Sequence, residues 1–270
     1  MSKLKALLLA AGFGSRLKPL TDLWPKCLMP INGRPLLEYW LSALEELGIK
    51  EALINTHYRA NDVESFLNRP HLKGLVKSIY EPILLGTAGT LRANMNFFAG
   101  KPCLVIHADN WCQCNFKDFV DYHFAGRPKD CLITMMTFTA DNPMDCGIVK
   151  IDQRGRVLAF YEKPKIFIGN RANAAVYIME SEVLEWINSN SSVTDISTEV
   201  LPHFIGKIAT WHNNQIHRDI GSYEALKKAQ HDFDFKMPEK TIAAMDDWSK
   251  NFAEHKVHSY FQSFPKKDFC

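Results

Sequence analysis

Glycines and fixed positive charges follow the first apolar segment of the chain. The apolar run, typical of a strand, ends at Ala11 and is followed by Gly12 and Gly14. Arg16 and Lys26 come next, and Lys26 precedes a helical pattern. Glycine lets main-chain N–H groups approach a polyphosphate closely, and the two cations neutralise its charge. The arrangement predicts a binding site for a ligand with several phosphate groups.

Two common phosphate-binding patterns do not fit this loop. The dinucleotide fingerprint lacks its third glycine because Leu17 stands in that place, and residues 31–33 offer no acid for a ribose. The Walker pattern fails because no Gly-Lys-Ser/Thr follows the glycines. A tight turn without a ligand is the alternative interpretation of a lone Gly-x-Gly.

Acidic residues stand where two later segments end. Asp109 ends the apolar run that begins at Pro102, and Asp219 shortly precedes a helix start at Ser222. An aspartate at the end of a strand can cap the next turn, but Asp109 is expected on the same sheet edge as the glycine loop. A carboxylate beside a triphosphate is repelled unless a cation lies between them, so we interpret Asp109 as a Mg²⁺ ligand.

Strand-like and helix-like segments that could position these residues alternate through most of the chain. A helix is expected after Pro35, with Gly48 just past its end. The alternation predicts an α/β fold of Rossmann-like type, a mixed, mostly parallel sheet with helices on both faces. In such sheets ligands bind at the carboxyl ends of the strands. Strands are expected at Leu4–Ala10, Glu51–Thr56, Val76–Tyr80, Pro102–His107, Cys131–Phe138, Gly147–Ile151, Val157–Tyr161, Ala172–Met179 and Ile208–His212.

Composition narrows the class of protein. The 270 residues, 46% of them hydrophobic, suffice for a substantial core, and a formal charge of +2 without a basic stripe argues against nucleic acid. No apolar run reaches the ~18 residues of a membrane span and the N-terminus shows no signal-peptide pattern, so we expect a cytoplasmic protein. The seven scattered cysteines lack zinc-ligand spacing and are expected to be reduced thiols.

The chain divides into a catalytic domain, 1–230, and a C-terminal tail, 231–270. The tail contains many charges and aromatic residues but neither strand alternation nor a hexapeptide repeat. We expect a helical tail packed on the core, and a contact in a homodimer is the alternative.

The loop pattern G-x-G-S-R-L-x-P-L-T, followed by P-K-x-L-x-P-I, resembles the signature of the sugar-1-phosphate nucleotidylyltransferases. The resemblance extends from Leu4 to Gln230. It implies that Arg16, Lys26 and Asp109 are catalytic, with Arg16 and Lys26 on the phosphates of a nucleoside triphosphate, and that Asp109 and Asp219 share Mg²⁺. It also assigns the nucleotide-binding loop to Ala10, Ala11, Gly12, Gly14 and Ser15.

The same resemblance places residues 81–90 against the nucleobase. Gly86 leaves room for a flat base, Thr87 could cap the following helix, and Glu81 stands where a polar residue reads the base edge. A carboxylate only accepts hydrogen bonds, and guanine presents two adjacent N–H donors, which favours GTP. A Glu81 side chain that points into solvent is the alternative.

Sugar phosphate binding is implied for a third group of residues. Glu162 and Lys163 belong to a motif similar to the family's E-K-P, Gly147 resembles the glycine beneath the sugar, and Asn173 begins a segment similar to N-A-G-x-Y. Ala175 replaces the glycine of that segment, and its methyl group would narrow the pocket or shift the strand. A surface ion pair is the alternative for Glu162 and Lys163.

The resemblance is closest to the mannose-1-phosphate guanylyltransferase branch, through residues 85–89, 160–164 and 199–202. It implies Mg²⁺-dependent nucleotidyl transfer from an NTP, GTP in the first place, to mannose 1-phosphate or a related sugar 1-phosphate. The alternatives are dTTP or UTP with glucose 1-phosphate, a heptose 1-phosphate, or a regulatory paralogue that binds a nucleotide sugar without making it. A glycosyltransferase is disfavoured because residues 108–110, Ala-Asp-Asn, lack the Asp-x-Asp motif.

Overall fold

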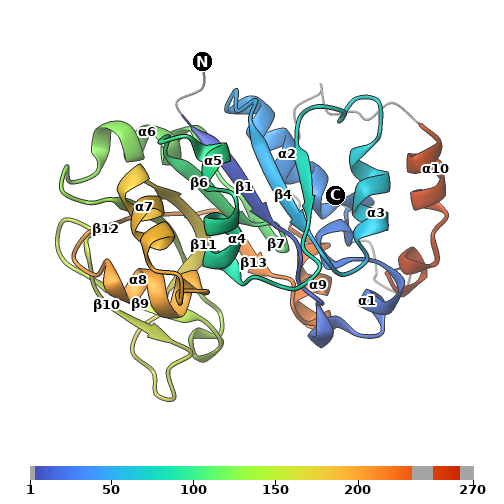
Figure 1. Cartoon of the computed structure of the whole chain (residues 1–270). Coiled ribbons are helices and arrows are strands. Elements are labelled where there is room, and N and C mark those ends of the chain that lie inside the picture. The colour runs from blue at the N-terminus through green and yellow to red at the C-terminus, as the bar shows by residue number, and fades with distance from the viewer. Residues whose placement is uncertain (1–3, 233–245, 262–270) are drawn as a thin grey trace.

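A nine-stranded mixed sheet forms the centre of the protein in a computed structural model that describes residues 4–232 and 246–261 (Figure 1). The strands are β1 (Lys5–Leu9), β4 (Ala52–Thr56), β5 (Lys77–Tyr80), β6 (Cys103–His107), β8 (Ile133–Thr139), β9 (Gly147–Ile151), β10 (Val157–Glu162), β11 (Arg171–Met179) and β12 (Ile208–His212). Strands β5, β4, β1 and β6 are adjacent and parallel, and β11 pairs antiparallel with β6. Beyond β11, β8 and β12 form one branch, and β9 and β10 the other.

Both faces of this sheet are covered by helices. Along β1, Ala6 and Leu8 belong to one apolar layer, and Leu7 and Leu9 to the opposite one. The first layer contains side chains of α1 (Leu20–Leu23), α2 (Leu36–Glu46), α3 (Ala60–Leu67), α6 (Phe116–Asp121), α9 (Tyr223–Ala229) and α10 (Asp247–Ala253). The second contains those of α4 (Thr87–Ala93), α5 (Met95–Phe98), α7 (Ser181–Ser189) and α8 (Leu201–His203). The predicted fold class is confirmed.

Two short ribbons supplement the main sheet and were not predicted from the sequence. Strand β2 (Pro30–Ile31) pairs with β3 (Arg34–Pro35), and β7 (Asn110–Gln113) pairs antiparallel with β13 (Ile216–Asp219). Because β7 starts directly after Asp109, and Asp219 is the register partner of Asn110, the second ribbon brings the two predicted metal ligands to one place.

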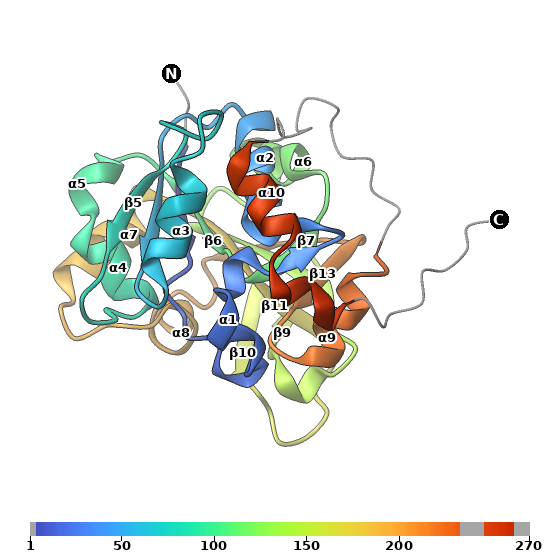
Figure 2. The same ribbon diagram turned by 90° about the vertical axis from the view of Figure 1, so that its right-hand side faces the viewer.

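The described part of the C-terminal tail is helical. It consists of α10 and a 3-10 turn at Lys256–Tyr260, and it packs against the same apolar layer as α2 and α3 (Figure 2). A homodimer contact through the tail stays a prediction. Among the described residues, no helix is both long and apolar enough to cross a membrane, and the six cysteines are unpaired.

Candidate active site

The glycine loop and Asp109 leave the sheet at the same edge. Strands β1 and β6 are parallel neighbours with Leu9 opposite His107, and the N–H of Ala108 donates to the carbonyl of Leu9 at 3.0 Å. The chain that follows each strand therefore emerges beside the other. This is the carboxyl edge at which parallel sheets bind their ligands.

Four of the predicted residues form one network of ion pairs at this edge. The Nζ atom of Lys26 lies 2.8 Å from Asp109 Oδ2 and 2.7 Å from Asp219 Oδ1. Arg16 Nη2 lies 2.9 Å from Asp219 Oδ2. The side chain of Lys26 is only 7% exposed, whereas that of Arg16 is 68% exposed. A buried ammonium thus holds two carboxylates together, and an exposed guanidinium pairs with one of them at the rim.

Burial and charge act in opposite directions on the groups of this network. Burial alone lowers the pKa of Lys26, but the carboxylates of Asp109 and Asp219 outweigh it and raise that pKa above its usual value. Burial raises the pKa of Asp219, but Lys26 and then Arg16 outweigh it and lower that pKa to about 2. At neutral pH both Lys26 and Asp219 are therefore charged.

The glycine loop is held by hydrogen bonds to strand β4 and to helix α1. The N–H of Ala10 donates to Asn55 Oδ1 on β4 at 2.8 Å. Gly14 lies at φ +61, where a Cβ would also come within 2.7 Å of Thr21 Cγ2, and Thr21 Oγ1 donates to the Gly14 carbonyl at 3.0 Å. Gly12 and Ser15 are exposed and Ala11 is buried, so the loop between them is open to a ligand while its base is fixed.

Glu81 lies in a different environment from the one that the sequence argument assumed. It is 3% exposed, and its carboxylate accepts hydrogen bonds from Asn55 Nδ2 at 3.1 Å, from Thr90 Oγ1 at 2.6 Å and from the N–H of Leu85 at 3.3 Å. Both oxygens already serve donors of the protein itself. This corrects the expectation of a carboxylate open to two guanine donors, and it equally excludes a side chain in solvent. Glu81 instead connects the glycine loop, through Asn55, to the start of α4.

The role predicted for Thr87 as a helix cap is wrong. The N-cap of α4 is Gly86, and no side chain caps this end. Thr87 Oγ1 instead donates to Asp195 Oδ2 at 3.2 Å and accepts a hydrogen bond from the N–H of Ile196 at 2.7 Å. These two bonds fix the segment at residues 195–196 to the start of α4. Gly86 lies at φ +77, and a Cβ there would lie 2.4 Å from the carbonyl oxygen of Thr194. The glycine is therefore required by this close packing.

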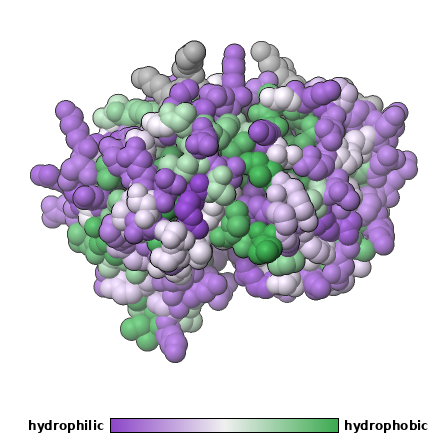
Figure 3. All heavy atoms as spheres, viewed as in Figure 1, coloured by the Kyte–Doolittle hydropathy of each residue, from purple (hydrophilic) through white to green (hydrophobic). Residues whose placement is uncertain are grey.

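Apolar side chains reach the surface beside the same segment. Ile83, Leu84 and Leu85 are all exposed between β5 and α4, and Figure 3 shows apolar atoms gathered over this part of the face. Phe13 of the glycine loop is 50% exposed. Apolar groups beside an open loop are typical of a site for a flat ligand.

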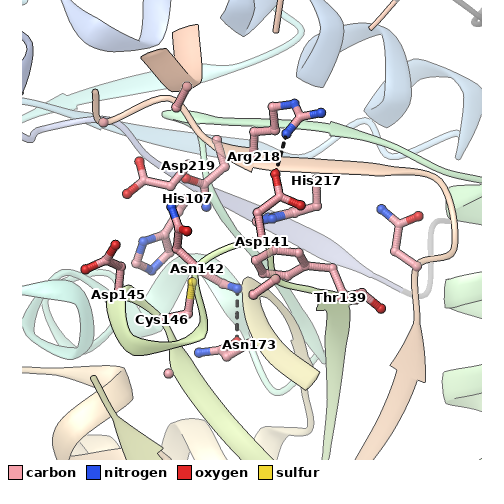
Figure 4. Close-up of a pocket in the computed structure, with 18 of the residues that line it drawn as sticks. His107, Thr139, Asp141, Asn142, Asp145, Cys146, Asn173, His217, Arg218 and Asp219 are labelled. Carbon is pink, nitrogen blue, oxygen red and sulfur yellow. Dashed lines mark hydrogen bonds and ion pairs between the residues drawn. The ribbon is translucent and has the colours of Figure 1, made fainter. Parts of the chain in front are cut away.

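A polar cavity of about 750 Å³ borders the ion-pair network. Figure 4 shows this cavity with Asp219, one residue of the network, in its wall. Its wall receives side chains from β6, β11 and β13, and it includes the predicted residues Arg16, Asp109, Gly147, Glu162, Lys163, Asn173 and Asp219. The structure thus places the predicted sugar phosphate residues in the same cavity as the two predicted metal ligands, Asp109 and Asp219. The glycine loop, Glu81, Gly86 and Thr87, which were predicted to bind the nucleotide, do not line this cavity.

Close packing fixes the part of the cavity that carries the predicted sugar phosphate residues. A Cβ on Gly147 would lie 2.6 Å from Phe160 Cζ and 2.9 Å from Glu162 Oε2, so glycine allows both side chains to approach the backbone. Lys163 adopts φ +45, and its N–H donates to the carbonyl of Cys146 at 3.1 Å. Burial raises the pKa of Glu162.

The alanine at position 175, in place of the glycine of the family pattern, has a conformational cost. Ala175 lies at φ +53, at an irregularity in the pairing of β11 with β8, and it lines the cavity. A left-handed conformation costs an L-residue roughly 1–2 kcal/mol, and glycine avoids that cost. Asn173 supports the turn: its Oδ1 accepts the N–H of Ala175 at 3.0 Å, and its Nδ2 donates to the Tyr177 hydroxyl at 2.6 Å.

Two supporting residues were missed by the sequence analysis. Asn55 connects the glycine loop to Glu81, but a buried strand asparagine has no distinctive sequence pattern. Gly221 packs directly against the ion pairs, because a Cβ there would lie 2.6 Å from Arg16 Nη2 and 2.9 Å from Asp219 Oδ1. The sequence could have indicated Gly221, because it stands two residues after the predicted metal ligand Asp219.

The two carboxylates suit a cation that is completed by its substrates. Within residues 4–232 and 246–261, no three or more His, Cys, Asp or Glu side chains converge to hold a metal ion. Mg²⁺ is commonly bound by one or two carboxylates together with substrate phosphates and water. Asp109 and Asp219, which already share the Lys26 ammonium, fit that pattern.

Comparison with known proteins agrees with this geometry. The sequence model of the family described as Nucleotidyl transferase matches residues 5–234. The chain is 34% identical over 203 residues to the mannose-1-phosphate guanylyltransferase catalytic subunit beta of Drosophila melanogaster, which covers 73% of this chain and 53% of that protein. The chain belongs to the nucleotidyl transferase family. It spans about half the length of the curated relatives that it matches.

Solved structures share the fold at lower identity. A provisionally assigned glucose-1-phosphate thymidylyltransferase from Bacillus anthracis, in complex with sucrose, superposes with a TM-score of 0.76 at 23% identity, over 88% of this chain and 98% of that one. HddC from Yersinia pseudotuberculosis, complexed with GMP-PN, gives a TM-score of 0.69 at 23% identity, over 85% and 99%.

The ion-pair network predicts how Asp219 titrates. Its lowered pKa means that its contribution to stability is complete above pH 3.8 and is lost as the pH falls through about 2.

The variant Lys26→Met tests this network. It removes the largest cause that lowers the pKa of Asp219 while burial remains, so the pKa of Asp219 should rise. Carboxyl-carbon NMR titration measures this. Asp246, whose pKa is lowered to about 2 with Arg69 as partner, is the internal control. An unchanged Asp219 titration in Lys26→Met would contradict the network.

Proposed function

We propose that this chain transfers a nucleotidyl group from a nucleoside triphosphate, GTP in the first place, to a sugar 1-phosphate and releases pyrophosphate. One observation carries the proposal. Two cations and two carboxylates from positions 16, 26, 109 and 219 converge between an open glycine loop and a polar cavity. A triphosphate on the loop and a sugar phosphate in the cavity would meet at these charges.

The reaction requires positioning and charge neutralisation more than proton transfer. An oxygen of the sugar phosphate, already ionised at neutral pH, attacks the α-phosphorus and forms the new P–O bond. The bond from the α-phosphorus to the bridging oxygen breaks, and pyrophosphate leaves with that electron pair. In-line positioning and electrostatic stabilisation account for most of the catalysis in phosphoryl-type transfers.

The residues of the site would divide these tasks. Arg16, exposed at the rim, would neutralise the leaving pyrophosphate, and Lys26 would neutralise the reacting phosphates. Lys163 would hold the sugar phosphate at the far side of the cavity. Mg²⁺, held by Asp109 and Asp219, would supply additional positive charge to the phosphates of both substrates.

The choice of GTP and mannose 1-phosphate rests on the named relatives. The Drosophila relative is a mannose-1-phosphate guanylyltransferase, and HddC was solved with GMP-PN. The argument from a free Glu81 carboxylate no longer supports GTP, because that carboxylate is engaged within the protein. The alternatives are dTTP or UTP with glucose 1-phosphate, a heptose 1-phosphate, and a regulatory paralogue.

Pyrophosphate release tests the reaction and its substrates together. GTP, UTP, dTTP, CTP and ATP are each combined with mannose 1-phosphate, with glucose 1-phosphate and with a heptose 1-phosphate in the presence of Mg²⁺. The proposal predicts release with GTP and mannose 1-phosphate. Release only with dTTP or UTP would retain the reaction and reject the base. No release with any pair, a heptose 1-phosphate included, would reject catalysis and favour the regulatory paralogue.

Asp109→Asn tests the metal assignment. Removing one preorganised charge from such a site typically costs on the order of 10²–10³ in rate, so kcat should fall by about that factor. The matched control is Asp121→Asn, which removes a carboxylate from an exposed ion pair with Lys117 on α6 and should leave kcat unchanged. Near-normal turnover of Asp109→Asn with Mg²⁺ would show that Asp109 is not a required ligand.

A further inference from the structure

The turn that carries Lys26 is closed by a neighbouring tryptophan. Lys26–Leu28 is a 3-10 turn that follows Trp24 and Pro25. The indole Nε1–H of Trp24 donates to the carbonyl of Leu28 at 2.9 Å. The Trp24 ring therefore spans the turn, so the position of the ring and the position of the ammonium are linked.

Side chains of the C-terminal segment 246–261 cover this ring. The ring centroid of Trp24 lies 6.1 Å from that of Trp248, 5.7 Å from that of Phe252 and 4.5 Å from that of His255. Trp24 is 9% exposed in the structure. Figure 2 shows the turn that follows α10 beside α1, which immediately precedes Trp24. Much of the burial of Trp24 therefore comes from a segment that lies beyond the family match at residues 5–234.

A buried arginine anchors the same segment. The Arg69 side chain is 2% exposed, and its Nε lies 2.8 Å from Asp246 Oδ2. Its Nη2 donates to Ser249 Oγ at 2.7 Å, and its Nη1 lies 3.2 Å from Glu38 Oε2 on α2. The guanidinium carbon stands 4.8 Å from the ring centroid of Trp248. Asp246 also accepts the N–H of Ser249 at 2.8 Å and so caps α10. Arg69 thus joins the segment to the core at the tryptophan that contacts Trp24.

We propose that residues 246–261 are a positioning element for Lys26: by packing on Trp24 they hold the 20–28 segment in the geometry that nucleotidyl transfer requires. The catalytic consequence rests on the proposed function, whereas the ordering of the segment does not. None of these tail residues touches the cavity, so they act through Trp24. In such a reaction a displacement of about 1 Å of a positioning group can cost on the order of 10²-fold in rate.

Trp248→Ala is the first test, and it has a matched control in the chain. Trp186 on α7 is also half-buried, but it stacks on His203 at 4.1 Å in the layer on the opposite face of the sheet. Backbone hydrogen exchange of residues 20–28 should accelerate in Trp248→Ala and stay unchanged in Trp186→Ala. In pyrophosphate release, kcat of Trp248→Ala should fall by about ten- to a hundredfold, with KM for the sugar 1-phosphate unchanged. Trp248→Phe, which keeps an aromatic ring, should restore most of kcat.

A second variant covers the case in which Trp248→Ala does not fold. Asp246→Ala removes the Arg69 ion pair and the cap of α10 but keeps every aromatic contact, so it should show the same changes at smaller size. Unchanged exchange of residues 20–28 in the folded tail variants would refute the positioning role, whatever the activity. Faster exchange with unaltered kcat would refute its catalytic consequence. If the wild-type protein is inactive but hydrogen exchange of residues 20–28 still accelerates in the tail variants, only the proposed function is refuted.

Discussion

The structure of the site depends on one electrostatic constraint, the shared ammonium of Lys26. Two carboxylates from distant parts of the chain approach each other, which is unfavourable unless a cation lies between them. Removing an ammonium from water costs several kcal/mol, and only well-placed opposite charges offset that cost. Lys26, Asp109 and Asp219 therefore stabilise one another in this arrangement.

The topology makes this constraint possible. The parallel pair β1 and β6 delivers the glycine loop and Asp109 to one edge, and the β7–β13 ribbon carries Asp219 back to it from the end of the family domain. Outside that domain, the segment 246–261 covers Trp24 and is fixed by Arg69. The site is thus positioned by the sheet on one side and by the C-terminal segment on the other.

The sequence predicted those features whose physical cause is local. Apolar runs predicted all nine strands of the main sheet to within two residues at either end. The loop motif identified Arg16 and Lys26, and the end of an apolar strand identified Asp109; the structure brings the three together through Asp219. The ribbons were missed because short strands carry little periodicity. Glu81 was misjudged because its carboxylate accepts hydrogen bonds from Asn55 and Thr90, which lie on other elements of the fold. Thr87 was misjudged because its hydroxyl binds Asp195, which is distant in sequence. For Ala175 the sequence showed the replaced glycine and predicted a narrower pocket or a shifted strand, whereas its positive φ became visible only in the structure.

Calorimetric titration of GTP into the wild-type protein, in Mg²⁺ and again in EDTA, tests the central claim most directly. If the four charged residues form a triphosphate site completed by a shared cation, GTP binds with Mg²⁺, and its affinity falls when the cation is removed. The same titration on Asp219→Asn should show a smaller dependence on Mg²⁺. Equal affinity in Mg²⁺ and EDTA, or no binding of any nucleoside triphosphate, would contradict the account.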